Sequence, residues 1–180
     1  MTGSNGKTTV KEMIATIFKA AVGEEHTLVT RGNLNNDIGL PLTLLRMRSA
    51  DRLAVIELGM NHPGETAELA VIAQANIALI NNAQREHQEF MATVEAVAAE
   101  HAAALNTLPL DGVAVFPADS EFSDLWYQAA AKRKVIDFAL STESVVPKAS
   151  VTGKLLASGR VEIATEFGNI EVQLNTLGNH

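Results

Sequence analysis

The chain has 180 residues, of which 47% are hydrophobic and 19% are charged, and its formal net charge is −7. This composition predicts one folded domain and excludes both a disordered chain and a membrane-spanning composition. The acidic excess predicts no general attraction for nucleic acid or anionic lipid, so any bound phosphate has to be held locally. The absence of cysteine excludes disulfides, thiolate metal sites and a cysteine nucleophile, and it fits a reducing compartment. Because we find no signal-peptide pattern and no apolar run of about 20 residues, we expect a cytoplasmic protein that does not insert into membranes.

Hydrophobic spacing predicts a helix near the start of the chain, followed by alternating strands and helices. Apolar residues from Val10 to Ala21 recur every three or four positions, which is typical of a helix with one buried face. Four short apolar runs suit strands buried on both faces, and helical stretches over 67–73 and 93–108 lie between them. Crossover helices join parallel strands, so this part predicts an α/β fold of the P-loop type, with a mostly parallel sheet flanked by helices. The four runs are 53–58, 76–80, 112–116 and 135–138.

The pattern changes after Pro147, where three strand-like runs are separated by two turn signals that contain glycine. This alternation predicts an antiparallel β meander. Because about 30 residues cannot bury a core of their own, we expect 148–180 to extend the same sheet and 1–180 to form a single domain. The three runs are 151–156, 160–167 and 170–174.

A glycine-rich stretch at residues 2–9, TGSNGKTT, here called the phosphate loop, runs directly into the first predicted helix. Glycine lets backbone N–H groups turn inward, the helix N-terminus adds positive potential, lysine neutralises β- and γ-phosphate charge, and a threonine hydroxyl binds Mg²⁺. The spacing is G-x-x-G-K-T, because Met1 stands where the first glycine of the longer motif would fall. ATP or GTP binding is the favoured interpretation, and a Gly-Asn turn with a helix cap is the alternative. The candidate nucleotide-binding residues are Gly3, Ser4, Asn5, Gly6, Lys7, Thr8 and Thr9.

Polar side chains follow two of the predicted buried strands. Glu57 stands at the end of the first, where ligands of open α/β sheets bind, and its carboxylate could hold Mg²⁺ beside a loop threonine. The alternative is a glutamate that only turns to solvent. Asn82 and His87 follow the next strand, although a lone histidine is more often structural. The loop at 30–45, TRGNLNNDIGLPLTLL, is rich in donors, and its pattern fits a ligand-facing loop and an ordinary Asn/Gly connection equally well.

Five stretches taken together resemble, in this order, the central ATPase domain of the Mur ligases. The resemblance covers essentially the whole chain. It implies an ATP-dependent ligase of peptidoglycan precursor synthesis, in which a substrate carboxylate becomes an acyl phosphate that an amine then displaces. The stretch NNDIGLPLTLL favours UDP-MurNAc-tripeptide and D-Ala-D-Ala as substrates over those of other Mur ligases or of folylpolyglutamate synthase. A non-catalytic nucleotide-binding or interaction module is the alternative from another class. The five stretches are TGSNGKTT, GNLNNDIGLPLTLL, AVIELGMNHPGE, NNAQREHQEF and LNTLGNH.

The resemblance also implies roles for particular residues, with ATP and Mg²⁺ as cofactors. Lys7 would neutralise the β- and γ-phosphates, while Thr8 and Glu57 would hold a first Mg²⁺. His87 would hold a second Mg²⁺ between the γ-phosphate and the substrate carboxylate, which makes Lys7 and His87 the candidate catalytic residues. Residues that would face the substrate are Asn35 and Asn36, and those that would lie near the nucleotide base and ribose are Asn82, Gly178, Asn179 and His180.

The chain departs from the family pattern at three places. The family's buried strand before the loop, its N-terminal UDP-sugar domain and its C-terminal domain all fall outside these 180 residues, so we expect an excised central domain that is inactive alone. Many members also place a carbamylated lysine on the helix after the His87 loop, where it helps to hold the second Mg²⁺. That position falls at His101. We expect either that His101 or the neighbouring Glu100 substitutes for the carbamate, or that His101 simply packs inside the fold.

Overall fold

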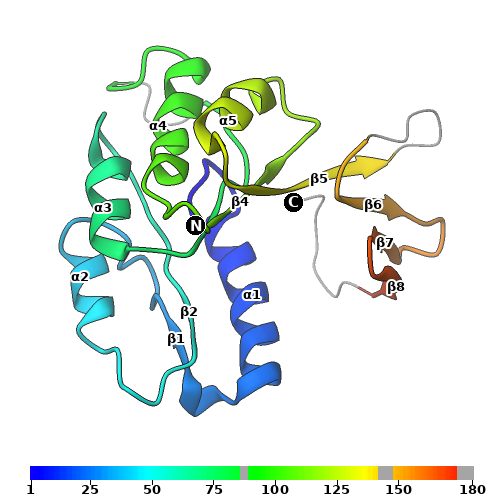
Figure 1. Cartoon of the computed structure of the whole chain (residues 1–180), viewed down its shortest axis with the longest axis horizontal. Coiled ribbons are helices and arrows are strands. Elements are labelled where there is room, and N and C mark those ends of the chain that lie inside the picture. Colours follow the sequence, from blue (N-terminus) through cyan, green and yellow to red (C-terminus); the bar gives the residue numbers. More distant parts are fainter. Residues whose placement is uncertain (86–88, 142–147, 174–180) are drawn as a thin grey trace.

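The structure is a computed structural model that describes residues 1–85, 89–141 and 148–173. Helices and strands alternate along most of this length (Figure 1). The helices are α1 Lys7–Val22, α2 Gly39–Leu44, α3 Glu65–Ala73, α4 Val94–Asn106 and α5 Ser123–Ala130, with a 3₁₀ turn η1 at Glu24–His26. The strands are β1 Thr27–Val29, β2 Leu53–Val55, β3 Ile77–Leu79, β4 Val113–Pro117, β5 Lys134–Ser141, β6 Val151–Leu155, β7 Val161–Thr165 and β8 Gly168–Val172.

Helix α1 packs on a small parallel sheet made of β1 and β2. In Figure 1 these strands lie between α1 and the pair α2 and α3. The helix begins directly after Gly6, whose φ of 75° lies in the left-handed region, and it ends at Gly23, whose φ is 96°. The buried face of the helix contains Lys11 and Ala15. Neither residue belongs to the apolar spacing, and Ile17, which does belong to it, is 65% exposed. The predicted helix is present, but its buried face differs from the face that the apolar spacing predicts.

The parallel strands β3, β4 and β5 form one side of a larger sheet, whose strand order is β3-β4-β5-β6-β7-β8. Helix α4 connects β3 to β4 and α5 connects β4 to β5, and the two helices pack on each other and on these strands. Leu105, Phe116 and Trp126 are fully buried at this contact, and the Trp126 indole donates to the Ala98 carbonyl at 3.0 Å. The α/β core that the sequence predicts is confirmed.

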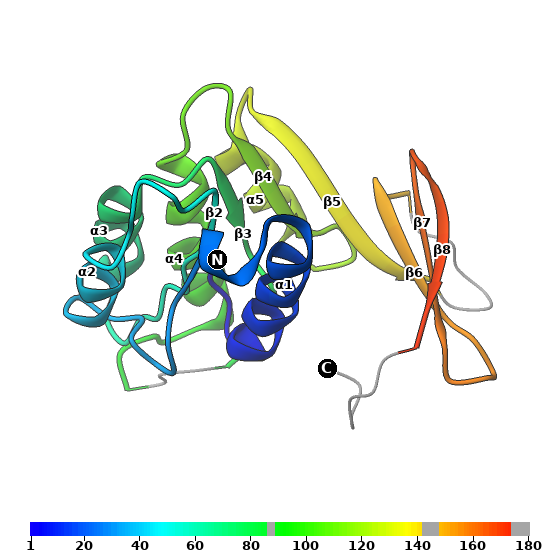
Figure 2. The same cartoon turned by 90° about the horizontal axis from the view of Figure 1, so that it is seen from below.

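Strand β6 continues the larger sheet parallel to β5, and β7 and β8 follow in antiparallel pairing. Figure 2 shows this meander standing away from the helices. The predicted antiparallel meander is thus present and joined to the sheet up to Val172. Its last predicted residues, 174–180, lie outside the described residues.

The first two residues lie between the two sheets and bond to both. Met1 donates to the Ile56 carbonyl at 2.6 Å and accepts from the Leu58 amide at 2.8 Å, directly after β2. Thr2 donates to the Leu79 carbonyl at 2.8 Å, at the end of β3. The carboxyl ends of β2 and β3 therefore meet where the phosphate loop starts.

The sequence pattern does not predict β1 or α5, and the run predicted as a strand over 53–58 is longer than β2. The ladder of β2 ends at Val55, because the hydroxyl of Thr30 accepts the Glu57 amide at 3.0 Å in place of a strand partner. Strand β1 has only three residues, too few to show a period. Among the helices of the described ranges, none has the length and apolar character needed to cross a membrane.

Candidate nucleotide-binding and ligase site

The phosphate loop packs tightly against the segment that follows β3. Gly3 has a φ of 140°, and a Cβ atom there would lie 2.9 Å from the Cβ of Asn81, so this position requires glycine. The amide of Ser4 donates to the Asn82 carbonyl at 3.2 Å, and the amide of Asn5 donates to the Asn82 side-chain oxygen at 2.9 Å. Asn82, predicted near the nucleotide, therefore supports the loop directly.

Lys7 begins α1 and folds its ammonium group back onto the loop. Its Nζ donates to the carbonyls of Gly3 at 2.6 Å and Ser4 at 3.0 Å. The cation therefore lies inside the turn, where the N-terminus of α1 also contributes positive potential. Phosphate oxygens could replace the two carbonyls as acceptors, which is what a phosphate-binding loop requires. Thr9 is exposed in the first turn of the helix.

The structure brings Thr8 and Glu57 together, as the sequence predicts. The Thr8 hydroxyl donates to Oε2 of Glu57 at 3.3 Å, and the side-chain amide of Asn35 donates to Oε1 at 2.7 Å. Glu57 is only 1% exposed, although it carries a formal charge. The end of β2 and the loop after β1 thus converge on the first turn of α1.

Lys11, which belongs to no motif of the sequence, also reaches Glu57. Its side chain is fully buried, its Nζ lies 3.7 Å from Oε2 of Glu57, and it donates to the Gly32 carbonyl at 3.3 Å. A buried carboxylate needs such a compensating charge. The signal was present in the spacing, because Lys11 follows Lys7 by four residues and Thr8 by three, which places all three on one helix face.

The side chains of Thr8 and Glu57 fit a magnesium ion that arrives with a nucleotide. Mg²⁺ bound with phosphates usually takes one or two carboxylates and fills its other positions with water and phosphate oxygens. Within the described ranges no group of three or more His, Asp or Glu side chains is placed to hold a metal ion. A metal at this hydroxyl and carboxylate would therefore depend on phosphate oxygens and water.

Asn35 and Asn36, predicted to face a substrate, lie in the loop between β1 and α2. Asn35 is held by Glu57, while the side-chain oxygen of Asn36 accepts the Gly39 amide at 2.8 Å at the start of α2. The two asparagines thus differ in position, and Asn35 is the one beside the candidate metal site. The predicted site residues outside the described ranges are His87, Gly178, Asn179 and His180.

His101 and Glu100 both have structural partners away from Glu57. The His101 imidazole is fully buried beneath the phosphate loop, with Nδ1 3.0 Å from the Thr2 hydroxyl. The Glu100 carboxylate accepts the amides of Gly64 at 2.9 Å and Thr66 at 2.8 Å, at the start of α3. Both side chains thus have hydrogen-bond partners within the fold, and His87, beside which the second Mg²⁺ is expected, lies outside the described residues.

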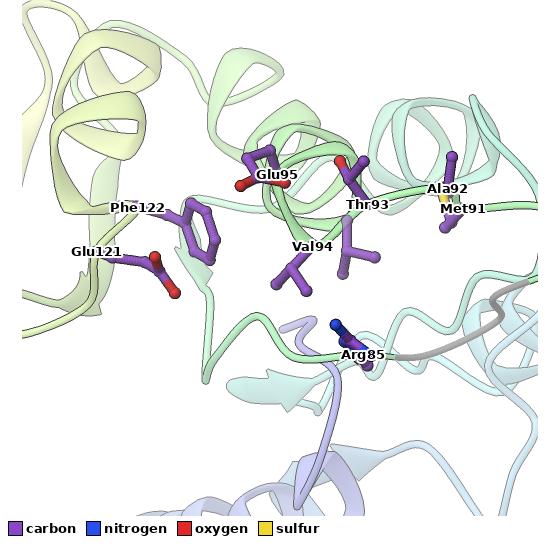
Figure 3. A pocket seen from close by; sticks show the side chains of 9 residues that line it. Arg85, Met91, Ala92, Thr93, Val94, Glu95, Glu121 and Phe122 are labelled. Carbon is purple, nitrogen blue, oxygen red and sulfur yellow. The ribbon is translucent and has the colours of Figure 1, made fainter.

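A cavity of about 430 Å³ lies at the carboxyl ends of β3 and β4. Figure 3 shows Arg85, from the loop after β3, pointing toward Val94 at the start of α4, with Phe122 at the opposite wall. Ligands of open α/β sheets bind at this edge, so the cavity extends the candidate site. No motif predicts this cavity, because its walls come from three separate segments of the chain.

The fold and the site together define a nucleotide-binding α/β domain of the P-loop class, because a glycine loop, a lysine and a hydroxyl–carboxylate pair meet at the carboxyl ends of parallel strands. The chain belongs to the Mur ligase family. The family model described as "Mur ligase middle domain" matches residues 1–180.

Curated relatives carry the name UDP-N-acetylmuramoyl-tripeptide--D-alanyl-D-alanine ligase. The chain is 38% identical over 181 residues to that of Haemophilus influenzae and 37% identical over 183 residues to that of Escherichia coli. Both alignments include 100% of this chain and 39% of the relative, so the chain spans about two fifths of the length of these proteins.

Solved structures show the same fold. MurF from Acinetobacter baumannii has a TM-score of 0.83 at 30% identity, over 96% of this chain and 37% of that one. MurF ligase from Thermotoga maritima, in complex with ADP, has a TM-score of 0.81 at 26% identity, over 99% of this chain and 40% of that one. The predicted family and fold are confirmed.

Proposed function

We propose that this chain binds ATP and Mg²⁺ at the phosphate loop and supplies the ATP-using part of a ligase that joins D-Ala-D-Ala to UDP-MurNAc-tripeptide. The observation that carries the proposal is the Thr8 hydroxyl 3.3 Å from the buried Glu57 carboxylate, beside the loop that holds Lys7. The names of the relatives and the ADP complex of the Thermotoga maritima protein support it. We place the activity in the cytoplasm, where ATP is available as phosphoryl donor.

The reaction brings two anions together, the substrate carboxylate and the γ-phosphate. A carboxylate oxygen attacks the γ-phosphorus, the bond to the β–γ bridging oxygen breaks, and ADP leaves with that electron pair. The amine of D-Ala-D-Ala then attacks the acyl carbon of the acyl phosphate, which expels phosphate, and the amine gives up a proton. The products are an amide, ADP and phosphate. Neutralising charge in the first step is the main demand on the protein.

The side chains of this site meet that demand at defined positions. Lys7, already inside the loop, would neutralise phosphate oxygens, and Thr8 and Glu57 would hold the Mg²⁺, which supplies further charge neutralisation when bound. Lys11 holds Glu57 in place. Asn35, which donates to Glu57, would face the precursor. His87 is proposed as ligand of a second Mg²⁺.

The test uses the protein that carries these 180 residues and measures ADP release that depends on both UDP-MurNAc-tripeptide and D-Ala-D-Ala. We expect Lys7→Ala to abolish turnover, because losing a charged phosphate contact costs roughly 3 kcal/mol or more at the transition state. Lys19→Ala is the matched control, since Lys19 lies on the same helix but pairs with Glu24 at 3.2 Å. It is expected to retain full turnover.

Other outcomes separate the alternatives. ATP binding without release of ADP in the presence of both substrates would favour a non-catalytic nucleotide-binding module. Dependence on a different amine would assign the chain to another Mur ligase or to a folylpolyglutamate synthase. Turnover by Lys7→Ala at the unmodified rate would remove Lys7 from the mechanism. The 180 residues alone are expected to release no ADP, because the relatives use a much longer chain for the reaction.

A further inference from the structure

His101 connects helix α4 to the phosphate loop through contacts with Thr2 and Ser4. Its ring has no exposed surface, its Nδ1 lies 3.0 Å from the Thr2 hydroxyl, and its Nε2 lies 3.5 Å from the Ser4 hydroxyl. Thr2 and Ser4 flank Gly3, where a Cβ atom would lie 2.9 Å from the Cβ of Asn81, just after β3. A neutral imidazole accepts a hydrogen bond at one nitrogen and donates at the other, so one ring can serve both hydroxyls.

Besides the bonds from Lys7 to the Gly3 and Ser4 carbonyls, several contacts that hold this part of the loop come from residues 79–84. Thr2 donates its amide to Leu79, and the Ser4 hydroxyl both donates to the Gln84 carbonyl at 3.2 Å and accepts the Gln84 amide at 2.9 Å. His101 adds an attachment from a different element, helix α4. The loop is therefore attached to the end of β3, to α1 through Lys7 and to α4 through His101.

We propose that His101 is a positioning residue for the phosphate loop: through Thr2 and Ser4 it holds the loop backbone in its phosphate-binding form before a nucleotide arrives. A loop that is already ordered does not lose conformational freedom on binding, so affinity rises without any new contact to the ligand. His101 itself is buried below the loop and does not touch the nucleotide. The nucleotide part of this inference rests on the proposed function.

The test compares three substitutions of His101 in this chain. His101→Leu removes both hydrogen bonds, His101→Asn keeps a polar atom near the Nδ1 position, and His101→Gln keeps one near the Nε2 position. The first readout is amide hydrogen exchange of Gly3 to Gly6 without nucleotide, and the second is the Kd of a fluorescent ATP analogue with Mg²⁺.

We expect His101→Leu to speed amide exchange of the loop about tenfold and to raise the Kd of the ATP analogue about tenfold. A factor of about ten corresponds to the loss of one buried hydrogen bond. The contact of His101 to Thr2 is shorter than its contact to Ser4. His101→Asn should therefore retain more of the loop's protection from exchange, and more of the affinity for the ATP analogue, than His101→Gln. Thr2→Val removes the partner hydroxyl at nearly constant volume. It should reproduce the part of the loss in His101→Leu that comes from the bond to Thr2, and the double variant should be no worse than His101→Leu alone.

The matched control is Trp126→Phe, which removes another buried hydrogen bond to the same helix, from the indole to Ala98 at 3.0 Å. It should lower Tm as His101→Leu does but leave loop exchange and nucleotide affinity unchanged. Equal loop exchange in His101→Leu and Trp126→Phe would overturn the inference. A chain whose loop exchange responds to His101 but which binds no ATP would contradict the proposed function and leave the positioning role standing.

Discussion

Lys11 and Glu57 bury opposite charges 3.7 Å apart, with 0% and 2% of their side chains exposed. Removing one partner leaves the other buried and uncompensated, so Lys11→Met should lower the free energy of unfolding by roughly 3 to 5 kcal/mol. The double variant with Glu57→Gln should lose less than the two single losses combined, because the pair is removed as a unit. Urea unfolding measures each value.

The control for this pair is Glu12→Gln. Glu12 lies 3.1 Å from the same ammonium, but 60% of its side chain is exposed, so its loss should change the stability by less than about 1 kcal/mol. Additive losses in the double variant would mean that Lys11 and Glu57 stabilise the fold independently.

A second prediction at a single position concerns His101 and carbon dioxide. A carbamate forms on a neutral lysine amine, and an imidazole buried against Thr2 and Ser4 offers no such amine. Turnover by the protein that carries this chain should therefore be insensitive to added bicarbonate, and His101→Ala should lower kcat less than His87→Ala. Intact mass should show no added 44 Da, about the mass of one carbon dioxide on lysine. Stimulation by bicarbonate would show that a lysine elsewhere supplies the carbamate.

Asp137, on β5, links this strand to α5 and to the residue just before β6. On β5, its Oδ1 accepts the amide of Ser150 at 2.7 Å and the Ser150 hydroxyl at 2.5 Å, just before β6. Its Oδ2 accepts the hydroxyl of Tyr127 from α5. Burial opposes ionisation of Asp137, but the hydrogen bonds from Ser150 and Tyr127 outweigh it and lower the pKa below its usual 3.8. Burial, and then the bond to Asp137, raise the pKa of Tyr127 to about 12.

The lowered pKa of Asp137 predicts a pH dependence of stability. A carboxylate whose pKa is lower in the folded than in the unfolded state stabilises the fold above the unfolded pKa, and this contribution is lost as pH falls through the folded value. The Tm of the unmodified chain should therefore fall below about pH 4 more steeply than that of Asp137→Asn. Asp111→Asn, at an exposed carboxylate before β4, controls for the charge change and should keep the steep slope.

Long periodic elements were predictable and short ones were not. The spacing from Val10 to Ala21 predicts α1, a helix of sixteen residues, although it does not identify the buried residues Lys11 and Ala15. The alanine-rich stretch predicts α4, whose start is fixed locally by Thr93, which accepts the Ala96 amide at 3.1 Å. Strand β1 is held by pairing with β2, a contact distant in sequence. The local sequence pattern does not predict pairing between strands that are distant in sequence.

The same distinction applies to the candidate site. Lys7, Thr8 and Glu57 were predictable because each belongs to a contiguous motif or a strand end. Lys11 and His101 act through tertiary contacts with Gly32 and Thr2, which join segments 21 and 99 residues apart. Helical spacing predicts which face of the helix carries such a side chain. The residue that it contacts, and therefore its role, is known only from the fold.

Burial is spread unevenly over the molecule, and the larger sheet changes character along its width. Strand β4, in the middle of the parallel part, contains the fully buried Ala114 and Phe116. In β6, β7 and β8 no residue is buried, and Phe167 and Ile170 at the outer end are 91% and 58% exposed. The meander is therefore held mainly by its ladder hydrogen bonds, with little apolar packing behind them.

This unevenness predicts that the meander opens separately from the parallel core. Segments with few buried apolar contacts exchange their amides through local opening, whereas core strands exchange only through global unfolding. Amides of β7 and β8 should therefore exchange at least roughly a hundredfold faster than those of β4, with β5 close to β4. Hydrogen exchange at two protein concentrations measures this. Equal protection in β4 and β8 at both concentrations would contradict the prediction, while protection of β8 that rises with concentration would show that a second copy covers Phe167 and Ile170.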